Sequence, residues 1–322
     1  MFNIFKKSSE DTLEDAVYDF LDSEITPNQK ISEYTKQDIK SSLLWILRRN
    51  YKQSVKDIDY EWFCVFKKEL AESNYTAGSA RKYYNHIKRV VTWWRAKNNL
   101  RAVIFPKLDN IRQKTKEDKS ADQLAQLYRI IKSLSVDIEN KPEGIMTGHM
   151  IVNIRLYFTL RFLFETGIRV QEFNQVRVRD INFKTKELTI PQYLNSINKG
   201  VGRTIAISSE TLKLVKTFRN SESKIDFLNP YKFGTKDMYI AKRINVDLRA
   251  YCKRAGIKNC LFTVSDIRKI YTSVAAANQV DLNYLASHLG HTNCSTTYKY
   301  YSKSSIVLKS KKGRRKIRQL LC

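Results

Sequence analysis

The amino-acid sequence predicts a mainly helical (α+β) protein with two domains, of which the second contains a small antiparallel sheet. Three observations lead to this prediction. The chain has 322 residues, a length that usually corresponds to two domains. Hydrophobic residues make up 42% of it, which is enough to fill ordinary cores. They recur at helical spacing along most of the chain and follow a period of two only near residues 180–207.

We expect five segments along the chain. They are an acidic amphipathic helix (1–24), a helical domain (25–105), a basic linker (106–120), a second domain (121–302) and a basic tail (303–322). The first segment carries seven acidic residues and two lysines, and four apolar residues recur in it at helical spacing: Leu13, Val17, Phe20 and Leu21. Such a helix either packs on its own domain or docks onto a basic neighbour or another protomer.

The second domain combines helical patterns with a short alternating stretch. Helices are expected over 123–134, over 152–165 with a stop at Gly167, and over 171–176. Residues 180–183 and 187–190 predict a hairpin, and residues 203–207 predict a third strand. Further helices are expected from around residue 210 and over 241–255, 265–278 and 281–289.

The charge of the chain predicts a polyanionic partner. Its 58 Lys and Arg exceed its 32 Asp and Glu, which gives a formal net charge of +26. Each phosphate that a cationic side chain neutralises releases condensed counterions, so such an excess favours binding to nucleic acid. Charge alone leaves DNA, RNA and an anionic membrane open.

A membrane location and secretion are both disfavoured. The most apolar stretch, Ile151 to Phe164, contains Asn153, Arg155 and Arg161, whereas a span needs about 20 apolar residues. The first eight residues are not followed by the apolar region of a signal peptide. The five cysteines form no CxxC pair. We therefore expect a reducing intracellular compartment, cytoplasmic or nucleoid-associated.

The last helix of the first domain, from the turn at residues 74–78 to about Asn98, has two contrasting faces. One face is apolar and includes Tyr83, Ile87, Val90 and Trp94. About 200° away lies a polar face with Arg81, Asn85, Lys88, Thr92 and Arg95. A helix that faces a DNA groove needs this pattern, although many solvated helices share it. Lys114 and Lys116 of the linker would cross the DNA backbone, so that the two domains form a clamp.

Three segments that are far apart in the sequence combine residues suited to phosphate chemistry. The first is Glu165-Thr-Gly-Ile-Arg169-Val-Gln-Glu172, in which an arginine follows a glycine-terminated helix. The second is Ser265-Asp-Ile-Arg268, which opens a helix. The third is Leu289-Gly-His291, followed nine residues after the histidine by Tyr300, with Ser-Thr-Thr between.

These segments resemble the sequence boxes of the tyrosine recombinases, a family that includes phage integrases and Xer-type resolvases. The resemblance covers the second domain throughout and the first domain loosely. It implies a helical core-binding domain and a catalytic domain that cuts and rejoins DNA at specific recombination sites. It also implies a 3′-phosphotyrosine intermediate, a free 5′ hydroxyl, no metal or ATP cofactor, and a homotetramer on double-stranded DNA.

The chemistry assigns a role to each residue. Metal-free cleavage of a phosphodiester requires cations on the equatorial oxygens, and the planar forks of Arg169 and Arg268 suit this task. Tyr300 would attack the phosphorus, in preference to Tyr298 or Tyr301 because of its spacing from His291. Lys199, in a turn between two strands, would protonate the leaving 5′ oxygen, and Lys184 and Lys186 are poorer candidates. His291 would donate a hydrogen bond to the phosphate, and Glu172 would hold Arg169 in place.

One residue departs from the family pattern. Ser265 occupies the position three before the second arginine, where the family usually has histidine. A serine hydroxyl donates one hydrogen bond but carries no charge, and Lys269 could restore positive potential nearby. The departure keeps open a catalytically impaired DNA-binding regulator with the same fold. A type IB topoisomerase is a further alternative, because it uses a similar set of arginine, lysine and tyrosine.

Two other readings of the C-terminal region remain open. His288, His291 and Cys294 are spaced so that a structural zinc site is an alternative to the phosphate site. The tail, with the apolar stretch 304–308 followed by basic residues 309–318, either docks onto a neighbouring protomer or contacts DNA.

Overall fold

The structure is a computed structural model that describes residues 11–49, 53–108, 120–140, 147–190, 202–221, 226–232, 237–291, 294–295 and 297–298. The chain divides into two compact units, Met1–Lys116 and Glu117–Cys322. This division falls inside the segment 106–120 that the sequence marks as a linker. Most of that segment, and the whole basic tail, lie outside the described residues.

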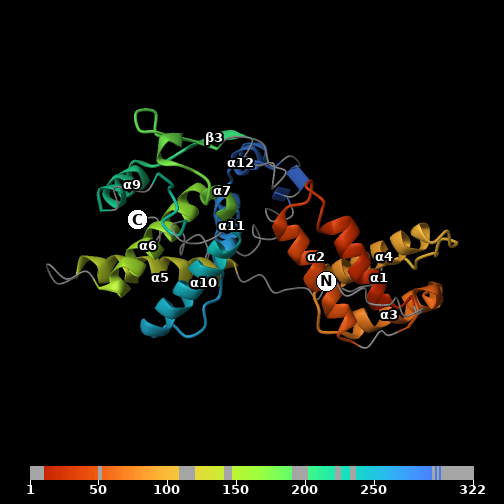
Figure 1. Ribbon diagram of the computed structural model, residues 1–322. Helices are drawn as coiled ribbons and strands as arrows, with labels where there is room; N and C mark the ends of the chain where they lie inside the picture. Colours follow the sequence, from red (N-terminus) through yellow and green to blue (C-terminus); the bar gives the residue numbers. More distant parts are fainter. Residues whose placement is uncertain are drawn as a thin grey trace, which may run out of the picture. The chain divides into compact units, whose positions relative to one another are not determined.

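The N-terminal unit consists of helices, drawn in red to orange in Figure 1. Their bounds are α1 Leu13–Phe20, the π-helical turn η1 Leu21–Ile25, α2 Glu33–Leu47, the 3-10 turn η2 Val55–Asp57, α3 Tyr60–Glu72 and α4 Ala77–Lys97. Helix α4 packs against α1, α2 and α3, and its buried residues include Ile87, Val90 and Trp94 of the predicted apolar face. Tyr83 lies at the edge of that face and stacks on Trp45, with ring centroids 4.3 Å apart.

The acidic N-terminal helix belongs to the core of its own unit. Leu13, Val17, Phe20 and Leu21 are all buried, as their helical spacing predicts. Its acidic side chains are exposed, and one of them, Glu24 of η1, accepts from Trp93 Nε1 of α4 at 3.0 Å. Of the two roles expected for this helix, packing on its own domain is therefore the one that the structure shows.

Helices also make up most of the C-terminal unit (Figure 1). Their bounds are α5 Ser120–Glu139, α6 Gly148–Thr166, α7 Val170–Phe173, α9 Ser209–Ser221, α10 Asp237–Arg254, α11 Ile267–Ala277 and α12 Leu282–Leu289, with 3-10 turns η3 Val178–Asp180 and η4 Val264–Asp266. Helix α6 is central and packs against α5, α9, α10 and α11. It begins four residues before the predicted start because Thr147 caps it, accepting from Met150 N at 3.3 Å.

A three-stranded antiparallel sheet is inserted between α7 and α9, in the order β1 Ile181–Asn182, β2 Glu187–Ile190 and β3 Arg203–Ala206. Leu188 pairs with Ile205 and Ile190 pairs with Arg203, so that the buried side chains of both strands share one face. The predicted fold class, mainly helical with a small antiparallel sheet, is confirmed.

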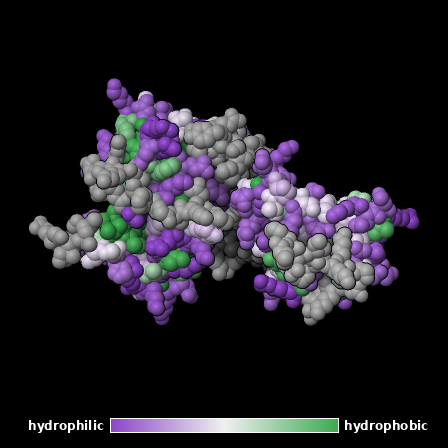
Figure 2. Space-filling model, viewed as in Figure 1, coloured by the Kyte–Doolittle hydropathy of each residue, from purple (hydrophilic) through white to green (hydrophobic). Residues whose placement is uncertain are grey.

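The surface of each unit is mostly hydrophilic on the face shown in Figure 2. Among the described helices, none is long and apolar enough to cross a membrane. Both observations agree with the charge and hydropathy of the sequence.

Gly167 ends α6 at a point where the chain needs a glycine. Its φ is +62°, in the left-handed region, and its N–H donates to Leu163 O at 2.9 Å. A Cβ at this position would lie 2.6 Å from the ring of Tyr271 on α11. Backbone conformation and side-chain packing therefore both exclude a larger residue two positions before Arg169.

We predict that Gly167→Ala lowers the free energy of unfolding more than Gly256→Ala does. Both glycines have positive φ, which costs an alanine about 1–2 kcal/mol. A Cβ at Gly256 meets nothing within 4 Å, whereas a Cβ at Gly167 overlaps Tyr271, which adds about 1–3 kcal/mol. Urea denaturation of the full chain measures both values. Equal losses of stability in the two variants would show that the Tyr271 ring moves away from the new methyl group without destabilising the protein.

Candidate active site

The centre of the site is the carboxylate of Glu172, at the end of the first turn of α7. It has no exposed surface. Arg169, the residue before α7, binds it twice: its backbone N–H donates to Oε2 at 2.8 Å, and Nη1 donates to Oε1 at 2.9 Å. The backbone contact starts the helix and the guanidinium contact orients the side chain, so that Glu172 holds Arg169 as the sequence predicts.

A second arginine, Arg203 from β3, binds the same carboxylate in a bidentate manner. Its Nη1 donates to Glu172 Oε1 at 3.1 Å and its Nη2 donates to Oε2 at 2.9 Å. Its Nε donates to the carbonyl oxygen of His288 at 2.5 Å, which links the sheet to the end of α12. The side chain of Arg203 is 6% exposed, against 22% for Arg169. Arg203 was not among the predicted site residues.

Arg268, near the start of α11, joins the three motif segments. Its Nη1 donates to the carbonyl of Gly167 at 3.1 Å, and its Nη2 donates to the carbonyl of Leu289 at 2.5 Å. The same Nη2 lies 2.9 Å from His291 Nε2, and Nη1 lies 3.9 Å from Glu172 Oε2. Residues that are about a hundred positions apart in the sequence therefore meet around one guanidinium.

His291 is neutral in this environment. Because Nε2 accepts from Arg268, the proton of the ring is assigned to Nδ1, which lies 2.6 Å from Thr297 Oγ1. Burial, together with the charges of Arg268, Arg169 and Arg203, lowers the pKa of His291 to about 4. Burial and the charge of Arg169 also lower the pKa of Arg268, to about 9, so that this side chain is still charged at neutral pH.

The charges in the site leave a positive excess. Burial by itself raises the pKa of Glu172, but the hydrogen bonds and charges of Arg203 and Arg169 outweigh it, and the pKa lies below its ordinary value. The carboxylate is therefore ionised and faces three guanidiniums, a net charge of +2. A site with this excess is suited to an anionic ligand.

A second layer of side chains supports the arginines. His288 Nε2 lies 2.9 Å from the carbonyl of Thr166 and 3.1 Å from the hydroxyl of Tyr271, and the two rings stack with centroids 5.5 Å apart. His288 thus fixes the end of α6. The contacts do not favour the zinc alternative: His291 uses both ring nitrogens and His288 its Nε2 within the protein, and Cys294 Sγ lies 3.6 Å from Asn283 Oδ1. No group of three metal-ligating residues occurs among the residues that the structure describes.

Ser265 lies in the 3-10 turn before α11 and Lys269 in the first turn of α11, so both are close to Arg268 in sequence. Ser265 is exposed in η4. Lys269 Nζ binds Asp266 Oδ1 at 2.6 Å, so its charge is directed toward the neighbouring turn. Its expected part in restoring positive potential beside Ser265 remains a prediction.

Several predicted site residues lie outside the described residues. These are Lys199, Tyr300, Lys114 and Lys116. Nearest to Tyr300, the structure describes Thr297, which is buried against His291, and Tyr298, which is 59% exposed.

The predicted DNA-contacting residues of α4 differ in their surroundings. Arg81 is exposed. Lys88 Nζ lies 4.4 Å from the centre of the Phe105 ring, and Arg95 donates to the carbonyls of Arg101 at 2.7 Å and Lys56 at 3.1 Å. Arg95 therefore ties α4 to its neighbouring loops, and Arg81 is the most accessible of the three cations.

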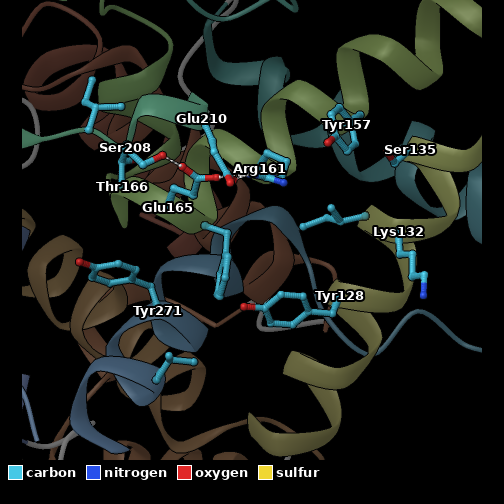
Figure 3. Close-up of a pocket in the computed structure, with 14 residues that line it drawn as sticks. Tyr128, Lys132, Ser135, Tyr157, Arg161, Glu165, Thr166, Ser208, Glu210 and Tyr271 are labelled. Atoms are coloured by element: carbon cyan, nitrogen blue, oxygen red, sulfur yellow. Dashed lines mark hydrogen bonds and ion pairs between the residues drawn. The ribbon is translucent and has the colours of Figure 1, made fainter. Parts of the chain in front are cut away.

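A cavity of about 610 Å³ in the C-terminal unit is not lined by the predicted site residues. It lies between α5, α6, α11 and the start of α9. Figure 3 shows Arg161 directed at Glu165 and Glu210, and Ser208 directed at Glu165. Thr166 and Tyr271, which line it, also contact His288, whereas Arg169, Arg203 and Arg268 do not line it.

Comparison with known proteins identifies the family. A profile of the phage integrase family matches residues 121–306, more than half of the chain. The chain belongs to this family. The matched region contains all the arginines of the cluster around Glu172. The resemblance to tyrosine recombinases that the sequence motifs suggest is thereby confirmed.

Individual relatives are distant. The chain is 28% identical over 150 residues to the tyrosine recombinase XerA of Pyrococcus furiosus. The aligned region covers 46% of this chain and 50% of that protein. It is 22% identical over 287 residues to the integrase of Staphylococcus phage L54a. This aligned region covers 80% of this chain and 79% of that protein. The chain spans 50% and 63% of the length of the two Pyrococcus XerA recombinases that it matches.

Solved structures agree with the fold. The Tn1549 transposon integrase, in complex with circular intermediate DNA, has a TM-score of 0.64 at 15% identity and covers 88% of this chain and 94% of its own. A lambda integrase dimer bound to a COC′ core site has a TM-score of 0.62 at 14% identity, covering 90% and 77%.

We predict that Arg203→Met destabilises the protein strongly. The substitution keeps much of the side-chain volume but leaves the buried Glu172 carboxylate without one of its partners, a loss of about 3–5 kcal/mol. Arg177→Met is the matched control, since Arg177 pairs with Asp226 at 2.9 Å on the surface and such a pair contributes about 0–1 kcal/mol. Urea denaturation compares them. A similar cost for both variants would contradict the role assigned to Arg203.

We also predict that stability falls as the pH drops from about 6.5 toward 4. Unfolded histidine takes up a proton near pH 6.5, at about its ordinary pKa, whereas folded His291 does so only at about 4. The unfolded state therefore binds more protons in this window, and the contribution of His291 is fully present only above it. His291→Gln should make this slope shallower, while His149→Gln, at an exposed position, should leave it unchanged. Identical slopes for all three proteins would show that His291 titrates normally.

Proposed function

We propose that this protein is a site-specific DNA recombinase that cuts and rejoins strands through a 3′-phosphotyrosine intermediate. The observation that carries the proposal is the cluster of Arg169, Arg203 and Arg268 around one buried carboxylate. Membership of the phage integrase family supports it, since relatives bear the names tyrosine recombinase, resolvase and integrase.

The charge of the cluster matches the reaction. In the transition state of phosphoryl transfer, negative charge spreads over the equatorial oxygens. Arg169 and Arg268 would contact these oxygens, and Glu172 and Arg203 would keep the two forks in place before the substrate binds. Donors that are held in advance require no reorganisation during the reaction, which is the main advantage of an electrostatic site.

The remaining roles follow from the sequence. Tyr300 would be the nucleophile, and Lys199 would protonate the leaving 5′ oxygen. The neutral ring of His291 faces Arg268 through Nε2 and Thr297 through Nδ1, so in this arrangement it would act as a group that positions Arg268, and donation to the phosphate, as the sequence predicts, would require the other tautomer. Neither metal nor ATP is required in this scheme.

The partner would be double-stranded DNA with specific recombination sites. Solved relatives include recombinases bound to DNA, one of them described as a dimer on its core site. We propose a homotetramer that brings two recombination sites together. Each protomer would contact the DNA through Arg81 and Lys88 of α4 and through Lys114 and Lys116 of the linker. Integration and excision for a mobile element, or Xer-like resolution, are the processes that fit, in a cytoplasmic or nucleoid-associated location.

Ser265 supports a second candidate, a DNA-binding regulator with impaired catalysis. Ser265 is exposed and uncharged at a position where the family usually supplies histidine. Strand relaxation of the type IB topoisomerase kind would use the same arginines. Strand cleavage would distinguish a recombinase from the regulator. Exchange of strands between two DNA sites would distinguish it from a topoisomerase.

We predict that Tyr300→Phe keeps DNA affinity and abolishes the covalent protein–DNA adduct, because phenylalanine has no hydroxyl to attack phosphorus. The adduct is measured on a nicked suicide duplex built from the inverted repeats in DNA that flanks the gene. Tyr298→Phe and Tyr301→Phe are the matched controls and should retain it. If the wild-type chain forms no adduct although it binds, the regulator is the better description. If the adduct is lost in a control variant instead, the nucleophile is misassigned.

A further inference from the structure

Two cysteines lie together in the C-terminal unit, away from the arginine cluster. Cys252 is in the last turns of α10, and Cys260 is in the segment that follows this helix. The turn between them has Gly256 at φ +65°, and Ile257 N donates back to Cys252 O at 2.9 Å. The chain thereby reverses, and both cysteines line one cavity of about 420 Å³.

The two cysteines are neighbours across this turn. Both line the same cavity, Cys252 lies in the core and Cys260 packs against it, and Cys260 Sγ–H donates to the carbonyl oxygen of Phe262 at 3.2 Å. Cys252 is 2% exposed, whereas Cys260 is only partly buried and can be reached from the cavity. The pair therefore consists of one sheltered thiol and one accessible thiol.

The surroundings favour the thiolate form of the accessible cysteine. A hydrogen bond from Cys252 lowers the pKa of Cys260, and the charge of Arg249 acts in the same direction, against the effect of burial. The same hydrogen bond and burial raise the pKa of Cys252. Lys253 and Lys258 line the cavity beside Arg249 and add positive potential at its mouth. A thiolate beside cations is the reactive form of cysteine.

We propose that Cys252 and Cys260 form a reversible redox-modification site, in which peroxide converts the two thiols into a disulfide. The Cys260 thiolate would attack one oxygen of hydrogen peroxide, breaking the O–O bond, and become a sulfenic acid; the other oxygen leaves as hydroxide, which takes up the proton that Cys260 released on ionisation and becomes water. The Cys252 sulfur would then attack Cys260 Sγ and displace the sulfenic hydroxyl as a second water. Sulfur loses two electrons in total, and peroxide gains them.

The position of the site connects it to the candidate active site. Beyond Cys260, Val264 N donates to Asn245 Oδ1 of α10 at 2.8 Å, and Thr263 donates to Asp266 at the start of the segment that carries Arg268. A disulfide would give this segment a covalent link to α10 and remove the Sγ–H contact with Phe262. The oxidation state of the two cysteines would therefore affect the segment that connects α10 to the helix carrying Arg268.

The test is peptide mapping of the full chain after hydrogen peroxide treatment and alkylation of the remaining thiols. We expect a peptide that joins Cys252 to Cys260, lacks two hydrogens and disappears on reduction, at a peroxide concentration that leaves Cys64 alkylated. Cys252→Ala should stop the reaction at a sulfenic acid on Cys260, detected as a dimedone adduct. Cys260→Ala should leave Cys252 unmodified, and Cys64→Ala should not change the cross-link.

Two outcomes would overturn the proposal. In the first, the wild-type chain shows Cys252 and Cys260 alkylated while Cys64 or Cys294 is oxidised. In the second, Cys260 is joined to another cysteine at the same rate as to Cys252. Both readouts are chemical and concern the wild-type chain, so neither depends on the folding of a variant or on recombinase activity.

Discussion

The C-terminal unit depends on one buried carboxylate. An ionised group without exposed surface is tolerated only when its oxygens are fully hydrogen-bonded to partners of opposite charge. Glu172 meets this condition with donors from its own helix start and from β3, and it has Arg268 of α11 within 3.9 Å. Each donor belongs to a different part of the chain, so that the same bonds that stabilise the charge also fix the positions of helix, sheet and arginines relative to one another.

The two glycines that end α6 and α12 follow from this arrangement. Arg268 reaches the carbonyls at both helix ends, and Arg203 reaches the carbonyl of His288. A Cβ on Gly290 would lie 2.6 Å from Arg203 Nη1, and a Cβ on Gly167 would lie 2.6 Å from Tyr271. Both glycines have positive φ, which turns the chain sharply and leaves the carbonyls open to the guanidiniums. The same glycines therefore both end the helices and allow the arginines of the site to bind the carbonyls at the helix ends.

Local patterns made the fold and part of the site predictable from the sequence. Hydrophobic spacing located the helices, because each buries one face, and alternation located the three strands. The pairing of Arg169 with Glu172 was predictable because it is a contact within one turn. Arg203 was missed because its partner comes from a segment 31 residues away, and sequence spacing does not report such contacts. Its signal was present, since alternation places Arg203 on the buried face with Ile205 and Ile207, where a lone arginine requires a buried anion.

Mutual repulsion among the arginines makes the site suited to an anion. Burial is the main cause of the lowered pKa of Arg268, and the charges of Arg169 and Arg203 lower it further, so the cations destabilise one another; Glu172 compensates for only one of the three positive charges. Protonation of His291 would add a fourth; burial first, and then the three guanidiniums, keep its pKa low, and the ring accepts from Arg268. Under the proposed function, an anion at the partly exposed Arg169 would relieve this repulsion. The relief would grow as the bound group gains negative charge, so the same arrangement would stabilise a phosphoryl transition state more than a phosphodiester ground state.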